Sequence, residues 1–257
     1  MKVSVVTIVY NDEKGIGRTI DSVNSQTARS NIEYIVIDGD SKDATRQILK
    51  SSSDVIDILV SEPDKGIYDA MNKGLKRATG DYVIFMNSGD CFSGKEVVAD
   101  IIRRIDSLPK APAIVYGTYR ESNQGTLSAP IPCRSAKKIW YGPVASHQST
   151  FYNLHEVRKR GLEYDLNYRI AADYKFTLSI LAATEFDGMP VDICVSDFDV
   201  SGASNQNQNI GLREANKARR EVLGWSRSRT GSLTVALLGA RYMKRYLNPL
   251  YRFLRNR

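Results

Sequence analysis

The sequence predicts an α/β fold with a mostly parallel central sheet and helices packed on it. Two observations support this prediction. Short apolar runs alternate with amphipathic helical stretches over the first 90 residues, and polar, acid-bearing residues follow three of the runs. With 257 residues, 42% of them hydrophobic, the chain is also long enough to bury a sizeable core. We therefore expect one α/β domain over residues 1–222 and an extension over residues 223–257.

The first apolar runs form one β-α-β unit. Residues 3–9 (VSVVTIV) predict a buried strand. A helix follows, in which Ile16, Ile20 and Val23 recur at spacings of four and three. The run at 33–38 (EYIVID) predicts the second strand.

The same alternation continues beyond the second strand. Ser41 and Asp43 are candidate caps for a helix that carries Ile48 and Leu49. Residues 57–60 (DILV) predict a short third strand.

A third helix and a fourth strand complete this half of the chain. The helix is predicted over residues 66–78, and the strand over residues 82–86 (YVIFM). One face of the helix carries Ile67, Met71, Leu75 and Ala78. This order of elements indicates parallel pairing of the strands.

Polar residues follow three of the predicted strands, in the segments YND (10–12), DGDSKD (38–43) and NSGD (87–90). In a parallel sheet, ligands bind beyond the carboxyl ends of the strands. Bare carboxylates repel phosphate, so acid-bearing strand ends indicate a diphosphate held through a cation.

Other nucleotide sites fit the sequence poorly. A dinucleotide-binding site needs G-x-G-x-x-G at the first helix, but residues 10–17 lack the third glycine and carry acids where the pyrophosphate would dock. The P-loop pattern is absent from the sequence.

Cysteine and histidine usage argues against a zinc cluster. The three cysteines are scattered without C-x-x-C spacing, and there are only two histidines. This pattern favours a reduced, cytoplasmic compartment. Residues 1–12 resemble a first strand more than a signal peptide, and no apolar run reaches the roughly 18 residues of a membrane span.

Several ordered motifs together resemble family 2 glycosyltransferases, particularly bacterial enzymes of exopolysaccharide and colanic-acid-type assembly. The resemblance extends from residue 1 to about residue 222. Its motifs are SVVTIVYND (4–12), EYIVIDGDSKDAT (33–45), SEPDKGIYDAMNKGLKRATGDYVIFMNSGD (61–90), HQSTFY (147–152), YRIAADYKF (168–176) and FDVSGAS (198–204).

The resemblance implies the GT-A fold, a Rossmann-like nucleotide-binding architecture, with a nucleotide-sugar donor and Mg²⁺ or Mn²⁺ as cofactor. It also implies inversion at the anomeric carbon. Residues 1–90 would bind the donor, a UDP-sugar first of all, and residues 91–222 would bind the acceptor.

The resemblance also assigns roles at the first strand ends. Thr7, Tyr10 and Asn11 would line the nucleoside pocket, and Asp38 would bind the base or ribose. The alternative for the segment after Asp38 is helix capping.

Two residues before the third predicted helix are further candidates for donor binding. Asp64 and Lys65 lie where a cation and backbone N–H groups meet a ribose or phosphate. The alternative for them is a solvated turn.

The NSGD segment departs from the D-x-D-D pattern of many relatives. Asn87 and Gly89 replace the first and third positions, and Asp90 keeps the last. We expect Asp90 to be the principal metal ligand and Asn87 to support the donor, because diphosphate and water oxygens fill the remaining coordination positions. The alternative is a turn in which Asp90 accepts local N–H bonds.

The second half supplies the predicted catalytic base. Asp173 lies where the family carries its acidic catalytic residue, and Asp165 is the nearby alternative. A carboxylate that merely stabilises a helix N-terminus would also explain Asp173. We expect His147 and Gln148 to contact phosphate, metal or acceptor.

An aromatic pair precedes the HQSTFY motif. Trp140 and Tyr141 either stack on an acceptor sugar or are buried in the core. Both alternatives stay open.

The net charge of +7 is unevenly distributed. Residues 213–257 carry a local +10, which leaves −3 for the rest of the chain. Over residues 241–255, five cations fall on one side of a predicted helix, with Pro249 as a kink: Arg241, Lys244, Arg245, Arg252 and Arg255.

This amphipathic tail favours an anionic membrane surface. Domain or dimer packing is the alternative, and we expect no nucleic-acid binding because no recognition motif accompanies the charge. The sequence thus predicts a cytoplasmic, peripheral membrane protein.

The expected function is metal-dependent, inverting transfer of a sugar to a saccharide or lipid-linked acceptor in bacterial surface polysaccharide biosynthesis. The alternative is a nucleotide-sugar-binding module with impaired or no turnover.

Overall fold

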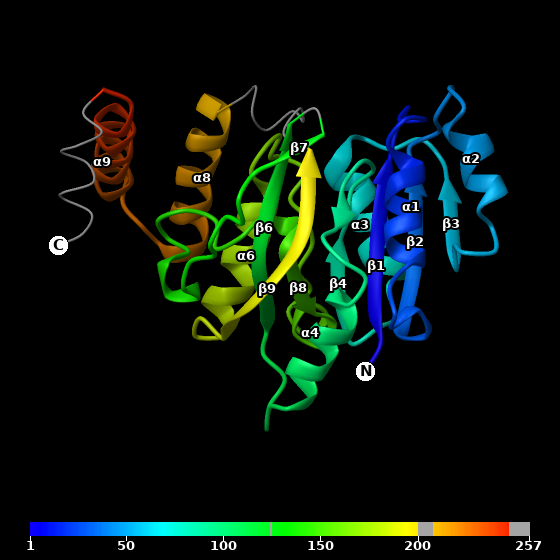
Figure 1. The fold of residues 1–257 in the computed structure, drawn as a ribbon. Coiled ribbons are helices and arrows are strands. Elements are labelled where there is room, and N and C mark those ends of the chain that lie inside the picture. The colour runs from blue at the N-terminus through cyan, green and yellow to red at the C-terminus, as the bar shows by residue number, and fades with distance from the viewer. Residues whose placement is uncertain (124, 200–207, 247–257) are drawn as a thin grey trace.

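The computed structural model describes residues 1–123, 125–199 and 208–246. A nine-stranded sheet runs through the described part of the chain, and helices pack on both of its faces (Figure 1). Its strands are β1 (Val3–Val9), β2 (Ile32–Asp38), β3 (Ile58–Ser61), β4 (Tyr82–Phe85), β5 (Cys91–Phe92), β6 (Ile114–Asn123), β7 (Thr126–Leu127), β8 (Thr150–Asn153) and β9 (Gly188–Asp199).

Over residues 1–90, the helices follow the strands in the alternation that the sequence predicts. They are α1 (Ile16–Asn24), α2 (Thr45–Ser51), α3 (Ile67–Arg77), α4 (Val97–Asp106), α5 (Leu154–Lys159), α6 (Ala172–Ala183), α8 (Gln208–Leu223) and α9 (Arg227–Tyr246).

The first half of the sheet is parallel. β1 pairs in parallel with both β2 and β4, and β2 pairs in parallel with β3. The predicted α/β fold with parallel strands is therefore confirmed for residues 1–90, where the strand order is β3-β2-β1-β4. The carboxyl ends of β1, β2 and β4 consequently lie on the same edge of the sheet.

The sheet becomes mixed beyond β4. β8 runs antiparallel to both β4 and β6, while β9 is parallel to β6 and antiparallel to β5. This mixed region brings residues near 90, 150 and 199 together at one end of the sheet.

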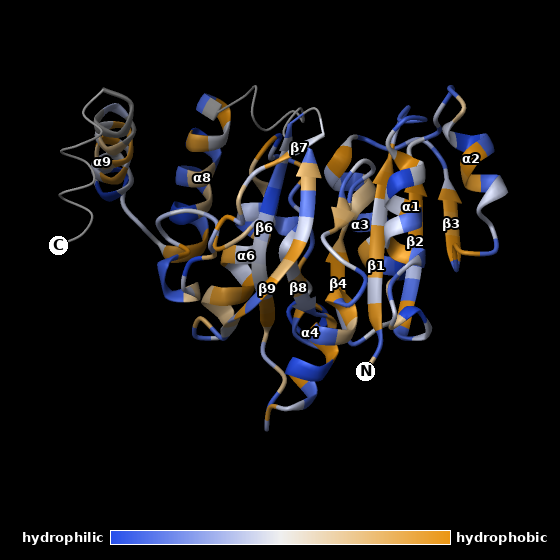
Figure 2. Cartoon of the chain, viewed as in Figure 1, coloured by the Kyte–Doolittle hydropathy of each residue, from blue (hydrophilic) through white to orange (hydrophobic). Residues whose placement is uncertain are grey.

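The core lies on both faces of the sheet. β1 is buried along its whole length, with Val6 and Ile8 in the cluster under α3 and α6, and Val5 and Val9 in the cluster under α1 and α4. Figure 2 shows hydrophobic residues running along β1, β3 and β4. Burial on both faces explains why β1, β2 and β4 appear in the sequence as nearly continuous apolar runs. The edge strand β3 is only partly buried.

Helix α3 lies unusually close to the sheet. A Cβ atom on Gly74 would come within 2.3 Å of Val6 Cγ1, so only glycine fits at this position. The predicted apolar face is correct for Met71 and Leu75 but wrong for Ile67, which is half exposed. Tyr68 is buried instead, because the helix begins at Ile67, beside the cavity described below.

The predicted caps of α2 are only partly correct. The helix begins after Ala44, and Asp43 Oδ1 accepts a hydrogen bond from Thr45 N at 3.0 Å. Ser41 does not cap this helix. Its Oγ accepts from Asn11 N at 2.8 Å and so ties the loop after β2 to the loop after β1.

Helices α8 and α9 follow the sheet region, with α8 against α6 and α9 at one end of the molecule (Figure 1). The tail helix predicted over residues 241–255 is described only as far as Tyr246, where α9 ends. Residues 247–257, with Pro249, and residues 200–204 of the FDVSGAS motif lie outside the described residues. None of the helices within the described ranges is long and apolar enough to cross a membrane.

Candidate active site

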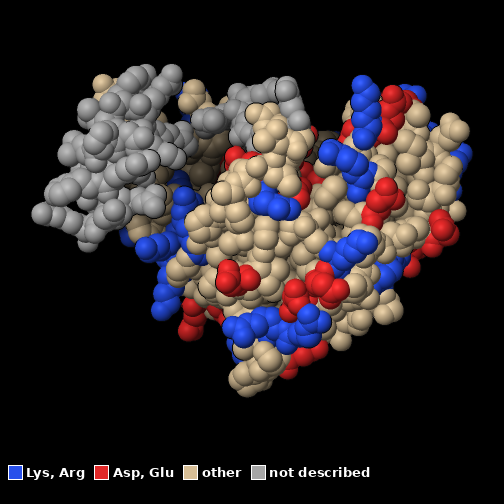
Figure 3. All heavy atoms as spheres, in the orientation of Figure 1, with Lys and Arg blue, Asp and Glu red and all other residues tan. Residues whose placement is uncertain are grey.

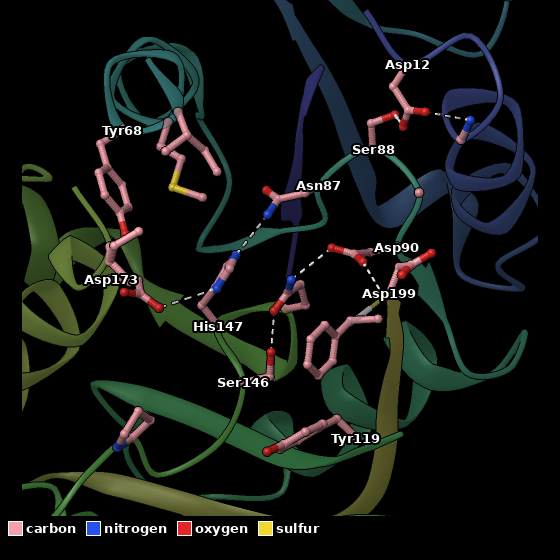
Figure 4. A pocket seen from close by; sticks show the side chains of 18 of the residues that line it. Asp12, Tyr68, Asn87, Ser88, Asp90, Tyr119, Ser146, His147, Asp173 and Asp199 are labelled. Atoms are coloured by element: carbon pink, nitrogen blue, oxygen red, sulfur yellow. Dashed lines mark hydrogen bonds and ion pairs between the residues drawn. The ribbon is translucent and has the colours of Figure 1, made fainter. Parts of the chain in front are cut away.

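A cavity of about 800 Å³ opens where the two halves of the sheet meet (Figure 4). One wall comes from the loop after β1, the start of α3 and the end of β4. The other comes from the turn before β8, the start of α6 and the end of β9. The cavity therefore lies beyond the carboxyl ends of the parallel strands, as predicted for the ligand site.

Asp90 lies deep in this cavity, with 5% of its surface exposed. Its Oδ2 accepts a hydrogen bond from Gln148 Nε2 at 2.8 Å, and its Oδ1 accepts from Asp199 N at 3.1 Å. Burial raises the pKa of Asp90 to about 6, against these hydrogen bonds, which lower it. The structure thus joins the two predicted residues Asp90 and Gln148 directly.

Asn87, His147 and Asp173 form a chain of side chains along another wall (Figure 4). Asn87 Nδ2 lies 3.1 Å from His147 Nε2, and His147 Nδ1 lies 3.6 Å from Asp173 Oδ2. Asn87 Oδ1 is buried and has no hydrogen-bond partner within the described part of the chain. The three residues predicted for donor support, ligand contact and catalysis are therefore in contact.

Asp173 lies in the first turn of α6 and faces the cavity. The Tyr68 hydroxyl from α3 points towards it (Figure 4). Burial, together with the nearby charge of Asp173, raises the pKa of Tyr68, so this phenol stays protonated at neutral pH.

Asp165, the alternative base, does not line the cavity. Its Oδ2 accepts from Lys175 Nζ at 2.7 Å. Although partial burial acts to raise it, the hydrogen bond from Lys175 brings the pKa of Asp165 down to about 2. Such a weak base, held in an ion pair, is poorly suited to accept a proton.

The first strand ends form a separate network. Thr7 is buried and its Oγ1 accepts from Tyr34 OH at 3.2 Å. Asp38 is also fully buried, and its carboxylate accepts from Ser41 N and Ser61 Oγ. These two residues shape the strand ends from within and do not line the cavity.

Three other predicted donor-binding residues surround the loops next to Asp38. Asn11 adopts a φ of 48°, and its Oδ1 accepts from Lys42 N at 2.7 Å. A Cβ atom on Gly39 would lie 2.4 Å from Asp64 Oδ2 and 3.3 Å from Tyr10. Gly39 is buried, and the side chains of Tyr10 and Asp64 lie against it. Tyr10 itself is exposed, and neither Tyr10 nor Asp64 lines the cavity.

Lys65 follows this cluster and is exposed. Its backbone N–H donates to Asp69 Oδ2 at 3.0 Å, and its side chain does not line the cavity.

Trp140 does not line the cavity either. Its ring lies 5.9 Å from that of Trp225 and 6.0 Å from that of Tyr141, and its carbonyl accepts from Arg219 Nε. Both Trp140 and Tyr141 are partly exposed, so neither is buried in the core. A role in acceptor stacking stays a prediction.

Sequence reasoning missed several polar residues of the cavity. Asp12 accepts from Ser88 Oγ at 2.6 Å and from Gly15 N at 3.0 Å, which links the loop after β1 to the end of β4. Asp199 ends β9 beside Asp90 (Figure 4). Both lie in segments that the resemblance already singles out, YND and FDVSGAS, and an acid at a strand end was the available signal.

Positive charge also reaches the cavity. Lys14, Arg18 and Arg169 line it, and Arg18 Nη2 donates to Gly89 O at 3.2 Å. On the face of the molecule in Figure 3, basic and acidic side chains are interspersed around the hollow. The cavity therefore offers both carboxylates and cations to a ligand.

A divalent cation fits this site only with the help of its ligand. The described residues contain no group of three or more His, Cys, Asp or Glu side chains that could hold a metal. Asp90 and Asp199 nevertheless bring two carboxylates to one edge of the cavity. Mg²⁺ is commonly bound by one or two carboxylates together with substrate phosphates and water, so this donor set fits a cation that arrives with a diphosphate.

The parallel first half, the mixed second half and the acid-lined cavity between them define a glycosyltransferase of the GT-A fold. The chain belongs to glycosyl transferase family 2, whose family description matches residues 4–160. It is accordingly a glycosyltransferase.

Curated relatives agree with this assignment. An uncharacterized glycosyltransferase of Mycobacterium tuberculosis is 36% identical over 207 residues, which cover 80% of this chain and 78% of the relative. The Escherichia coli enzyme UDP-Glc:alpha-D-GlcNAc-diphosphoundecaprenol beta-1,3-glucosyltransferase is 33% identical over 126 residues, which cover 49% of this chain and 48% of the enzyme.

Solved structures share the fold. Residues 1–349 of S. aureus TarS in complex with UDP superpose with a TM-score of 0.69 at 19% identity, covering 95% of this chain and 72% of that one. The mannosyltransferase PcManGT from Pyrobaculum calidifontis, in complex with GDP-Man and Mn²⁺, gives a TM-score of 0.67 at 16% identity, covering 88% and 65%.

Proposed function

We propose that the protein transfers a sugar, with inversion, from a nucleotide-diphosphate sugar to a saccharide or lipid-linked acceptor, in a reaction that needs a divalent cation. The pathway we propose is bacterial surface polysaccharide biosynthesis, with a UDP-sugar as the first donor to test. One observation carries the proposal: Asp90 from the donor half and Asp173 from the acceptor half line the same cavity.

Asp173 is the general base in this proposal. Its carboxylate takes the proton of the acceptor hydroxyl while that oxygen attacks the anomeric carbon. The bond from that carbon to the diphosphate breaks, and its electron pair leaves with the nucleoside diphosphate. Attack from the face opposite the leaving group inverts the configuration and requires no covalent enzyme intermediate.

We propose that His147 helps to orient Asp173. With Asn87 Nδ2 donating to His147 Nε2, the imidazole proton lies on Nδ1, 3.6 Å from Asp173 Oδ2. At this distance the pair is an electrostatic contact longer than a hydrogen bond, and it can favour one orientation of the carboxylate.

The leaving diphosphate meets both carboxylates and cations. Asp90, with Asp199 beside it, would hold Mg²⁺ or Mn²⁺, and the cation would stabilise the charge of the departing nucleoside diphosphate. Lys14 and Arg18 line the cavity and can neutralise the same charge. Lys65, which we also propose for this role, lies on the loop before α3.

The nucleoside is proposed to bind at the first strand ends. The side chains of exposed Tyr10 and of Asp64 lie together beside Gly39 and can contact a base or ribose. Thr7, Asn11 and Asp38 then act by holding these loops through hydrogen bonds.

The relatives support the choice of donor and acceptor. The E. coli relative is named for a UDP-Glc donor and a diphosphoundecaprenol-linked acceptor. S. aureus TarS is solved with UDP and with UDP-GlcNAc, and PcManGT with GDP-Man and Mn²⁺.

A membrane-bound acceptor is consistent with α9. Residues 227–246 contain five Lys or Arg and no Asp or Glu. Helix α9 exposes three apolar side chains, Val235 (72%), Leu238 and Tyr242. We propose that α9 and the residues after it bind an anionic membrane surface from the cytoplasmic side.

The alternative function is nucleotide-sugar binding with little or no turnover. It is favoured by one observation, the neutral Asn87 in the strand-end segment. Product formation separates the two functions.

The experiment is a screen of nucleotide-sugar donors for binding, hydrolysis and transfer, with Mg²⁺, with Mn²⁺ and with a chelator. Cation-dependent turnover of at least one donor is expected. Donor binding without turnover under every condition would select the alternative, and the absence of both would refute the proposal.

A further inference from the structure

The segment that precedes α6 is held by an acidic side chain of α8. Glu214 Oε1 accepts a hydrogen bond from Arg169 N at 2.8 Å, and Glu214 Oε2 accepts from Ile170 N and Ala171 N at 2.9 Å each. One carboxylate therefore binds three consecutive backbone N–H groups. Such hydrogen bonds to an ionised acceptor are short and strong, and three adjacent N–H groups form an anion-binding nest.

The residues around this nest carry two side chains into the cavity. Arg169, at its first N–H group, lines the cavity, and so does Asp173, two residues beyond its last. The same segment faces α3 of the donor half, where Tyr68 points towards Asp173 (Figure 4). Because the three N–H groups are fixed, the directions of Arg169 and Asp173 are fixed with them.

Other contacts between α8 and this region differ in kind. Glu221 accepts from Tyr168 OH at 2.8 Å and from Lys175 Nζ at 2.6 Å, so it joins side chains rather than the backbone. Glu221 therefore attaches α8 to α6 without holding the backbone at residues 169–171. On α8, Glu221 therefore contributes to attachment of the helix, whereas Glu214 holds the backbone of residues 169–171.

We propose that Glu214 is a positioning residue of the transfer reaction. Its carboxylate fixes the backbone of residues 169–171 and thereby the placement of Arg169 and Asp173 in the cavity. The inference rests on the proposed function, because Asp173 is the base only if transfer occurs. It makes α8, which lies beyond the family match at residues 4–160, part of the active site.

The test compares Glu214→Ala with Glu221→Ala in the full chain. For Glu214→Ala we expect kcat to fall by about tenfold or more while KM for the donor stays within about twofold, because displacement of a reacting group by 1 Å is costly. Glu221→Ala is expected to lower the melting temperature with a much smaller change in kcat.

Recovery of kcat on addition of formate distinguishes a positioning role of Glu214 from a purely structural one. Truncation of Glu214 leaves three N–H groups that a small carboxylate can occupy, so added formate is expected to restore part of kcat in Glu214→Ala. Formate should not restore Glu214→Gln, whose side chain still fills the space, or Glu221→Ala.

Hydrogen exchange at residues 169–171 tests the inference without turnover. We expect faster exchange of these amides in Glu214→Ala, slowed again by formate, and no such change in Glu221→Ala. Unchanged exchange, or a kcat within about threefold of the parent, would overturn the inference. A parent protein that transfers no sugar would refute the proposed function, and the exchange data would still decide whether Glu214 fixes the segment.

Discussion

The two halves of the molecule meet at one cavity but are built differently. The proposed donor half, residues 1–90, contains four parallel strands in the order β3-β2-β1-β4, and its site residues follow the strand ends. The proposed acceptor half is a mixed sheet, in which His147, Asp173 and Asp199 come from a short turn, a helix start and a strand end. In the first half, the site residues are brought together because they follow parallel strands. In the second half, they come from elements of different kinds that meet only in the folded chain.

This difference extends to the polar groups. In the donor half, the loops are tied to one another: Asp38 accepts from Ser41 and Ser61, and Asn11 accepts from Lys42. In the acceptor half, His147 and Asp173 face the cavity. We infer that the donor half supplies a preformed binding site and that the acceptor half supplies the groups that react.

The largest expected effect comes from Asp173→Asn in the acceptor half. The amide keeps the size and most hydrogen bonds of the carboxylate but accepts no proton, so kcat should fall by about 10² to 10⁴. Donor affinity, measured by calorimetry, should be little changed, because the donor half is intact.

Asp165→Asn is the matched control for this prediction. Asp165 lies in an ion pair with Lys175 outside the cavity, so its loss should affect stability more than kcat. If Asp165→Asn abolished transfer and the kcat of Asp173→Asn stayed within about threefold of that of the parent, Asp165 rather than Asp173 would be the base.

The next largest effect is expected at Asp90 in the donor half. Asp90→Asn should abolish cation-dependent donor binding, whereas Asn87→Ala should only weaken it, because Asp90 supplies the carboxylate. Calorimetric titration of the donor with and without Mn²⁺ measures both. If Asp90→Asn and the parent bound the donor with equal Mn²⁺-dependent affinity, Asp90 would not be a ligand of the cation.

From the pKa of Asp90 we expect opposite pH dependences of the free energy of unfolding and of donor affinity. Its folded-state pKa of about 6 lies above the ordinary 3.8, so between these values the folded state binds more protons than the unfolded state. Its contribution to the free energy of unfolding without ligand therefore falls as pH rises through this window. Cation-dependent donor affinity should rise over the same window, because the cation needs the carboxylate, and Asp90→Asn should remove both dependences.

The donor half was the more predictable from sequence, for a physical reason. Apolar runs buried on both sides and alternating helices specify parallel strands, whose polar ends must share one edge. The contacts of Asn87 with His147, and of Glu214 with residues 169–171, depend on the pairing of distant strands and helices. No local pattern encodes these distances.

Local departures from the predicted pattern have local causes. Ile67 fits the apolar period of α3 but lies at its first position, beside the cavity, where no core covers it. Trp140 is not buried in the core, which was one of its two alternatives, and its ring lies beside that of Trp225, far along the chain.

A smaller effect on the donor half is expected from Gly74→Ala. The added Cβ would lie 2.3 Å from Val6 Cγ1 in a packed core, so α3 must shift, at a cost of about 1–3 kcal/mol. Thermal unfolding should show this loss, and donor binding should weaken with it. Gly231→Ala in α9, where a Cβ meets nothing within 4 Å, is the control and should leave stability unchanged or raise it.

The smallest effect on either half is expected from removal of residues 241–257. Each Lys or Arg near an anionic bilayer contributes about 1 kcal/mol of binding, and the apolar face adds a contribution that salt does not screen. The truncated protein should lose binding to anionic liposomes in flotation assays but keep its donor affinity, because none of the residues proposed to bind the donor lies beyond Asp199. Replacement of Arg241, Lys244, Arg245, Arg252 and Arg255 by Gln should weaken attachment and reduce its salt dependence.

A full-length protein that does not bind anionic liposomes at low salt would contradict membrane binding. A truncation that unfolds both halves would instead make this helix part of the packing of the protein, and the comparison between the halves would then have to include it.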